Sequence, residues 1–255
     1  MMQSLSLRRR LLPLCAAALC LLSTPARAGE TSIAVAANFT EPAKRLAAAF
    51  EQKTGDTLVL SFGASGQILS QITQGAPYEV FLSADQARPQ KLEALGLAVP
   101  GTCFTYAVGR LVLWSAQPGF VDAQGKVLGT GRFAHLAIAN PQTAPYGVAA
   151  VEALKALGDF DAVAPKLVTG ESITQAYQFA ASGNAELGFV ALSQVVHAKT
   201  GSSWLVPQSL YKPISQDAVL LKAGEADPAA KAFLAYLQTP EARAVIRGYG
   251  YATGP

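Results

Sequence analysis

The stretch Leu58–Leu69, which reads LVLSFGASGQIL, decides the fold of this chain. It begins with an apolar run that is typical of a buried strand, and a turn of glycine, alanine and serine follows at once. A helix is predicted directly after the turn, because Ile68, Leu69 and Ile72 recur on one helical face. The first N–H groups of a helix have no partner within it, so such a turn predicts an anion-binding site around Ser65.

The same order of strand, turn and helix occurs at three further places along the chain. Asn38, Tyr146 and Ser172 each stand where a predicted strand has ended and a predicted helix begins. In open α/β sheets, ligands bind beyond the carboxyl ends of the strands, where helix N-termini converge. Two of the four turns lie in each half of the chain, so a cleft between two lobes would receive donors from both sides. A single turn of this kind is more often only a helix cap, and it is the pairing that favours a ligand site.

The predicted site favours a small, fully deprotonated anion. None of the four turns contains lysine or arginine, so N–H groups, hydroxyls and helix dipoles would balance the charge. Hydrogen phosphate would also need a hydrogen-bond acceptor, which backbone N–H groups cannot provide. A carboxylate would repel the anion, so we expect Glu171 to point away. We expect Asp85 to cap the helix that follows it or to form a contact between the lobes.

Residues 1–28 predict a cleaved signal peptide. Three arginines at positions 8–10 precede an apolar run over 11–22, and Ala26-Arg27-Ala28 is typical of a cleavage site. The apolar run is shorter than the ~20 residues that a membrane-spanning helix needs. We therefore expect cleavage after Ala28 and a mature chain in the periplasm.

Removal of the signal peptide changes the charge and the cysteine content. It takes four of the 20 basic residues and no acidic one, so 16 basic and 17 acidic residues remain and the formal charge falls from +3 to −1. This balance does not indicate a nucleic-acid or membrane partner. Cys103 is the one cysteine of the predicted mature chain, which excludes an intramolecular disulfide, and we expect it to be a buried small residue.

Strand-like and helix-like segments alternate along the rest of the chain, which predicts an α/β fold with helices on both faces of its sheets. Strands are predicted over 32–37, 58–62, 80–82, 136–139, 166–168 and 187–190. Helices are predicted over 42–53, 66–73, 88–95, 146–157, 173–181, 228–237 and 240–247, with Thr40 as the N-cap of the first. Two more apolar runs, near 106–114 and 214–221, are interpreted as crossings between two lobes. The predicted first lobe comprises 29–110 and 217–255, and the second comprises 111–216.

An enzyme is not expected from these residues. The segment around Ser65 differs from the G-x-S-x-G nucleophile elbow, because Gln67 stands where the last glycine belongs. A serine hydrolase also needs a base, and both histidines, His135 and His197, are predicted at edge or surface positions. The sequence contains no zinc-ligand spacing, Walker A motif or dinucleotide fingerprint. An exported hydrolase that uses Ser65 stays a lower-ranked alternative.

Several segments of the mature chain resemble the periplasmic molybdate-binding proteins of ABC importers. The resemblance covers essentially the whole mature sequence, and the Gly-Ala-Pro-Tyr and Ser-Ala-Asp-Gln segments are its most specific motifs. The matching segments are Val35–Phe39, Ser61–Gly66, Gly75–Tyr78, Phe81–Gln86, Pro141–Gly147, Leu187–Val190 and Tyr249–Tyr251.

The resemblance implies a two-lobed type II binding-protein fold that closes on molybdate or tungstate and delivers it to an ABC-type permease. It implies a monomer without a cofactor, and molybdenum bound as molybdate. By position, Asn38 and Ser65 would bind through side chain and backbone, and Tyr146 and Ile173 through backbone N–H groups. Ala37 completes the set, although it stands where related proteins have threonine.

Two further differences from the family and two alternatives accompany this interpretation. Many family members have serine where Asn38 stands, and Ala191 aligns with a tyrosine whose hydroxyl some members use. A carrier of another tetrahedral oxyanion such as sulfate is the alternative within the same class. A sensor domain that signals to a membrane partner would use the same closure.

Overall fold

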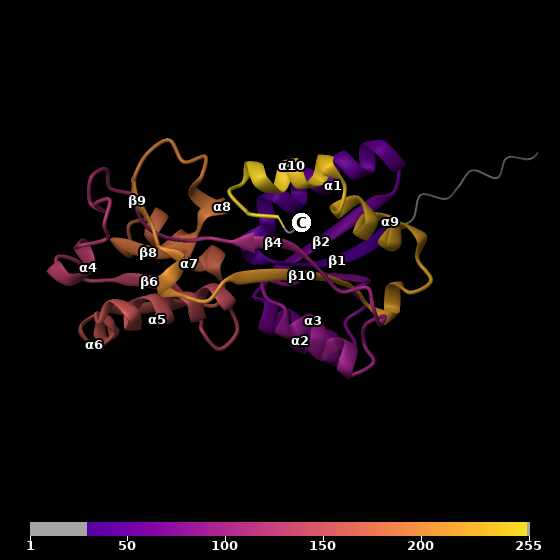
Figure 1. Ribbon diagram of the computed structural model, residues 1–255, viewed down its shortest axis with the longest axis horizontal. Coiled ribbons are helices and arrows are strands. Elements are labelled where there is room, and N and C mark those ends of the chain that lie inside the picture. Colours follow the sequence, from indigo (N-terminus) through magenta and orange to yellow (C-terminus); the bar gives the residue numbers. More distant parts are fainter. Residues whose placement is uncertain (1–29, 254–255) are drawn as a thin grey trace, which may run out of the picture.

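The computed structural model describes residues 30–253, in which two five-stranded sheets form two lobes (Figure 1). The predicted signal peptide and its cleavage site lie outside the described residues. Parallel pairs in each sheet are combined with antiparallel ones, and helices flank both sheets. The predicted two-lobed mixed α/β fold is confirmed. Within residues 30–253, no helix combines the length and the apolar character needed to cross a bilayer.

The first lobe contains the sheet of order β2-β1-β3-β10-β4. Its strands are β1 (Glu30–Ala36), β2 (Thr57–Gly63), β3 (Val80–Leu82), β4 (Phe104–Gly109) and β10 (Ile214–Leu220). Its helices are η1 (Ala37–Phe39), α1 (Thr40–Thr54), α2 (Ser65–Thr73), α3 (Ala87–Ala94), η4 (Lys222–Gly224), α9 (Pro228–Leu237) and α10 (Pro240–Gly248).

Strand β1 shows why this sheet has helices on both faces. Ile33 and Val35 pack with residues of α1, α9 and α10, whereas Ala34 between them packs with residues of α2 and α3. All three are fully buried, because successive side chains of a strand point to opposite faces and both faces are covered. Because both faces are covered, the sequence of β1 is apolar without interruption from Ile33 to Ala36.

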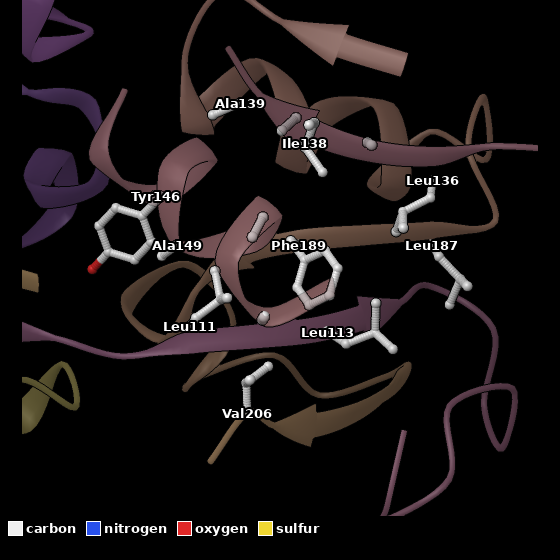
Figure 2. Packing of buried hydrophobic residues seen from close by; sticks show 14 of the residues in the cluster. Leu111, Leu113, Leu136, Ile138, Ala139, Tyr146, Ala149, Leu187, Phe189 and Val206 are labelled. Carbon is white, nitrogen blue, oxygen red and sulfur yellow. The ribbon is translucent and has the colours of Figure 1, made fainter. Parts of the chain in front are cut away.

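The second lobe contains the sheet of order β7-β6-β8-β5-β9. Its strands are β5 (Leu111–Ser115), β6 (Leu136–Ala139), β7 (Leu167–Gly170), β8 (Leu187–Ala191) and β9 (Ser202–Leu205). Its helices are α4 (Val127–Thr130), α5 (Pro145–Leu157), α6 (Phe160–Val163), η2 (Ala164–Lys166), α7 (Ile173–Ala181), α8 (Leu192–Val195) and η3 (Gln208–Leu210). Figure 2 shows its core, in which Leu111, Leu113 and Phe189 of the central strands pack against α5.

The apolar run over 106–114 is two strands in two different sheets. Strand β4 pairs with β10 in the first sheet, β5 pairs with β8 in the second, and Arg110 lies between them. Gly109 is required at this point, because a Cβ there would lie 2.1 Å from Tyr146 Oη and 2.7 Å from Gln216 Nε2. The predicted limits of the two lobes stay a prediction. Strand β10 extends across the predicted boundary between residues 216 and 217.

The predicted N-cap of the first long helix is wrong. Phe39 occupies the cap position, and Thr40 is already the first residue of α1. The cause is the 3-10 turn η1, which the sequence pattern did not reveal and which continues directly into α1. The hydroxyl of Thr40 therefore donates backward to Ala37 O, at 2.8 Å, instead of accepting from the helix.

Candidate functional site

The five residues predicted to bind the anion line one small cavity between the lobes. Ala37, Asn38, Ser65, Tyr146 and Ile173 are all among its 11 lining residues in the described part of the chain, and none of those 11 is charged. The cavity volume is about 10 Å³. Pockets for organic ligands measure roughly 300–1,000 Å³, so this cavity is too small for an organic molecule.

The cavity lies where two pairs of parallel strands end. Ala36 at the end of β1 pairs with Gly63 at the end of β2, and Ala139 of β6 pairs with Gly170 of β7 in the other lobe. Because parallel strands present their carboxyl ends at one edge of the sheet, the helices that follow begin side by side. Helices η1, α2, α5 and α7 therefore direct their N-termini toward the same space.

Ser65 is placed so that its hydroxyl hydrogen can donate into the cavity. Its side chain is 1% exposed, and its Oγ accepts a hydrogen bond from the N–H of Ala84 at 2.9 Å. Ala84, just after β3, lines the same cavity. Since the N–H of Ala84 uses a lone pair of the oxygen, the serine hydrogen is left to donate elsewhere.

Asn38 presents its backbone to the cavity, because its side-chain amide is engaged elsewhere. Nδ2 donates to Gln216 Oε1 and to Tyr251 Oη, both at 2.9 Å, and the residue is 3% exposed. An amide nitrogen has two hydrogens, so both are used in these bonds. The side-chain oxygen is an acceptor only and cannot bind an anion. The backbone N–H is the donor that Asn38 retains.

In the second lobe, Tyr146 and Ile173 lie in the first turns of α5 and α7, where N–H groups have no partner within the helix. The phenol of Tyr146 accepts a hydrogen bond from Gln216 Nε2 at 3.3 Å, and Gln216 is not among the residues that line the cavity. Gly147 lets α5 begin close to β6, because a Cβ there would lie 2.2 Å from Ala139 O. Ser172 does not line the cavity; it caps α7 by accepting from the N–H of Gln175.

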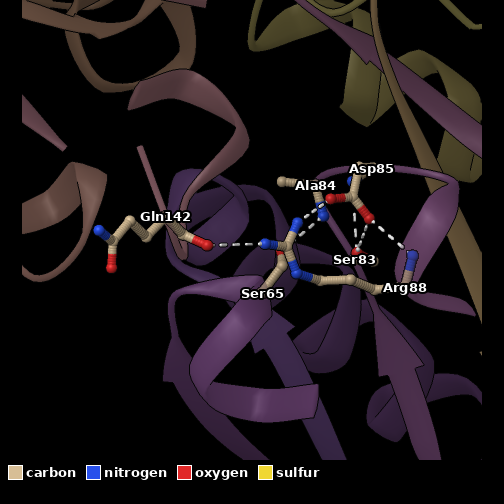
Figure 3. Close-up of polar contacts among 6 residues, drawn as sticks. All are labelled: Ser65, Ser83, Ala84, Asp85, Arg88 and Gln142. Carbon is tan, nitrogen blue, oxygen red and sulfur yellow. Dashed lines mark hydrogen bonds and ion pairs between the residues drawn. The ribbon is translucent and has the colours of Figure 1, made fainter. Parts of the chain in front are cut away.

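The two acidic residues near the site are held away from the cavity. Gln86 holds the N-cap position of α3, and Asp85 before it accepts from the N–H of Arg88 in the first turn and forms an ion pair with the Arg88 side chain (Figure 3). Glu171 accepts a hydrogen bond from Gln67 at 3.1 Å on the exposed side. Neither carboxylate is among the residues that line the cavity.

A buried polar network behind the cavity was not predicted from the sequence. Tyr251 Oη lies 2.8 Å from Asn38 O and 2.9 Å from Ser193 Oγ, and Gln216 Oε1 accepts from Tyr106 Oη at 3.1 Å. Burial raises the pKa of Tyr251 to about 12 and raises the pKa of Tyr106 and Tyr146 well above the ordinary value. These phenols are therefore neutral at physiological pH and serve as hydrogen-bonding groups.

A larger pocket of about 380 Å³ is less suited to an anion. It lies beside α3 and α5, and its lining includes the carboxylates of Asp85 and Glu152 as well as Arg88 and Lys212. Carboxylates repel an anion, and Arg88 is already paired with Asp85.

The chemistry that a hydrolase would need does not gather around Ser65. Both His135 and His197 are exposed, as predicted, and neither lines the cavity. Among residues 30–253 there is no group of three or more histidine, cysteine, aspartate or glutamate side chains that could hold a metal ion. Cys103 is only partly buried, which corrects the prediction; its thiol donates to Asp217 at 3.4 Å, and burial raises its pKa to about 12.

Comparison with known proteins identifies the family of this chain. Residues 31–252 match the family model described as bacterial extracellular solute-binding protein. The chain is 62% identical over 232 residues to the molybdate-binding protein ModA of Rhodobacter capsulatus. The aligned residues make up 91% of this chain and 92% of that protein. It is 57% identical over 234 residues to ModA of Azotobacter vinelandii, covering 91% and 93% respectively.

A solved structure shows the same architecture. The periplasmic molybdate-binding protein of Azotobacter vinelandii superposes with a TM-score of 0.86 and 44% sequence identity, over 88% of this chain and 100% of that chain. The two proteins therefore share both fold and sequence over most of this chain. This chain belongs to the family of bacterial extracellular solute-binding proteins.

Proposed function

We propose that this chain is the periplasmic binding component of an ABC importer and that it binds molybdate in the cavity between its lobes. The observation that carries the proposal is the convergence of four helix N-termini on an uncharged cavity of about 10 Å³. The relatives at 57% and 62% identity are molybdate-binding proteins, which favours molybdate over sulfate as the ligand. Molybdenum is then cargo, and no cofactor takes part.

Neutral donors from both lobes would satisfy the anion. In the first lobe these are the Ser65 hydroxyl and the backbone N–H groups of Asn38 and Ser65. The N–H groups of Tyr146 and Ile173 contribute from the second lobe. A buried dianion must be hydrogen-bonded, and donors with helix dipoles can achieve this without a formal positive charge. Ala37 lines the site but offers no side-chain donor.

A site that offers only hydrogen-bond donors would favour an anion that carries no proton. Molybdate and tungstate are fully deprotonated at neutral pH and need only donors. Hydrogen phosphate carries a hydrogen that would meet N–H or O–H groups and be left unpaired, which is costly in a buried site. Sulfate is also deprotonated, so only its smaller size would distinguish it.

Binding would shift the population toward the closed form, because donors from both lobes are satisfied together only when the lobes approach. We infer that a membrane permease recognises this closed form. A catalytic role is not proposed, since Ser65 has no histidine beside it.

Titration calorimetry on the mature chain tests this function. Molybdate, tungstate, sulfate and phosphate are titrated separately into the same protein. We expect saturable binding of molybdate and tungstate with a stoichiometry of one, and much weaker binding of sulfate and phosphate. Sulfate binding as tight as that of molybdate would support the carrier of another oxyanion instead.

A further inference from the structure

Gly66 forms a direct backbone contact between the lobes. Its N–H, in the first turn of α2, donates to Thr143 O in the turn before α5, at 2.9 Å. Gly66 follows Ser65, and Thr143 precedes Ala144, so the contact adjoins residues that line the cavity. Beside it, Arg88 Nη2 reaches Gln142 O at 3.5 Å (Figure 3).

A side chain at position 66 would collide with the second lobe. A Cβ there would lie 2.9 Å from Thr143 Cα and 3.0 Å from Thr143 O, both of which are backbone atoms. Its third neighbour, Arg88 Nη2 at 3.1 Å, is the end of a flexible side chain and can move aside. The collision with Thr143 is therefore the one that a side-chain adjustment cannot relieve.

The backbone on each side of the contact is held in place. In the second lobe, Ala144 N donates to Asn140 O at 2.8 Å, Gln142 N donates to Asn140 Oδ1 at 2.9 Å, and Asn140 N donates to Gly170 O at 2.8 Å. In the first lobe, the hydrogen bond between Ala84 N and Ser65 Oγ fixes the start of α2. Relief of the collision therefore requires the two lobes to move apart.

Nothing else about the position requires glycine. Gly66 is helical and is not among the glycines with positive φ, so alanine can adopt its backbone conformation. Alanine also has a higher helix propensity than glycine. The cost of a side chain at position 66 is confined to the contact between the lobes.

We propose that Gly66 is a positioning residue that sets how closely the lobes approach and thereby lets Ser65 and Tyr146 bind the same anion. This inference rests on the proposed function. Hydrogen bonds to oxygen span only about 2.7–3.2 Å, so a small increase in lobe separation weakens those from the far lobe. The effect falls on the bound, closed form and not on the folding of either lobe.

The test compares Gly66→Ala with Gly248→Ala, a control at a helical glycine of α10 whose Cβ would have no atom within 4 Å. Melting temperatures without ligand, molybdate dissociation constants, and association and dissociation rates are measured for both and for the unmodified chain. We expect both variants to melt at or above the temperature of the unmodified chain. Gly66→Ala should bind molybdate at least tenfold more weakly, mainly through faster dissociation, while Gly248→Ala binds normally.

Two results would overturn the inference. One is molybdate affinity of Gly66→Ala equal to that of the unmodified chain. The other is a melting temperature of ligand-free Gly66→Ala clearly below that of Gly248→Ala, because the position would then matter for folding itself. Failure of the unmodified chain to bind molybdate would instead reject the proposed function, so the two failures are distinguishable.

Discussion

The oxygen of Ser65 is fixed by the backbone N–H of Ala84, at 2.9 Å, which leaves its hydrogen as a donor toward the cavity. A single hydrogen bond thus orients a group from α2 against Ala84, which follows β3, and both Ser65 and Ala84 line the cavity. A serine at this position both completes the wall and supplies a directed donor without adding charge.

Replacement of Ser65 by alanine should weaken molybdate binding by about ten- to a hundredfold, since a hydrogen bond to a charged group contributes about 1.5–3 kcal/mol. The melting temperature should also fall, because the N–H of Ala84 loses its acceptor. Calorimetry well below the melting temperature separates the two effects. Ser182→Ala, at an exposed serine that follows α7, is the control. Unchanged affinity in Ser65→Ala would remove the hydroxyl from the site.

Gln216 links the two lobes, and its replacement by leucine should destabilise the chain. The side chain is fully buried, accepts from Asn38 and Tyr106, and donates to Tyr146. Loss of these partners leaves buried polar groups unsatisfied, at a cost of about 1–3 kcal/mol in the free energy of unfolding. Urea denaturation measures the change, and exposed Gln124→Leu serves as the comparison. Equal stability of the two variants would show that the network contributes little.

Asp227 should affect stability without affecting binding. Its carboxylate accepts from the N–H groups of Ala229 and Ala230 at the start of α9 and from the hydroxyl of Thr31. Asp227→Ala removes this cap and should lower the free energy of unfolding by about 1–2 kcal/mol. Asp227→Asn keeps a capping oxygen and should lose less. Molybdate affinity should equal that of the unmodified chain in both variants, since none of these residues lines the cavity. A weaker affinity would contradict the prediction that Asp227 affects stability alone.

The buried tyrosines predict a loss of stability in alkaline solution. The folded chain keeps Tyr251 protonated up to a pKa of about 12, whereas an exposed tyrosine loses its proton near 10.0. Above pH 10 the unfolded chain therefore binds fewer protons than the folded chain, and stability falls as pH rises. Urea denaturation between pH 7 and pH 11 should show a flat region and then a decline, which should be shallower in Tyr251→Phe. Stability that stays constant up to pH 11 would contradict this assignment.

Much of the site followed from local sequence because a strand, a turn and a helix are specified within about 15 residues. Ser65 and Ile173 begin helices almost where the pattern placed them, and both line the predicted cavity. The role of the Asn38 side chain could not be predicted in this way. Its partners Gln216 and Tyr251 are 178 and 213 residues away in the sequence, and only the fold brings them together.

Other features of the fold leave no clear pattern in the sequence. Hydrophobicity continues across Arg110, where the chain passes from one sheet to the other, because β5 is buried throughout and β4 is half-buried. Helices α4 and α8 span four residues each, which is too short for a helical period to emerge. Gly66 carries no visible signal either, since its importance lies in a contact with a residue 77 positions further along the chain.

Anomalous X-ray diffraction at the molybdenum absorption edge, from crystals of the mature chain grown with molybdate, tests the central claim most directly. We predict one strong molybdenum peak in the cavity, within hydrogen-bonding reach, through its oxygens, of Ser65 and Asn38 on one side and Tyr146 and Ile173 on the other. A molybdenum peak elsewhere, or one bound through lysine or arginine side chains, would contradict the account.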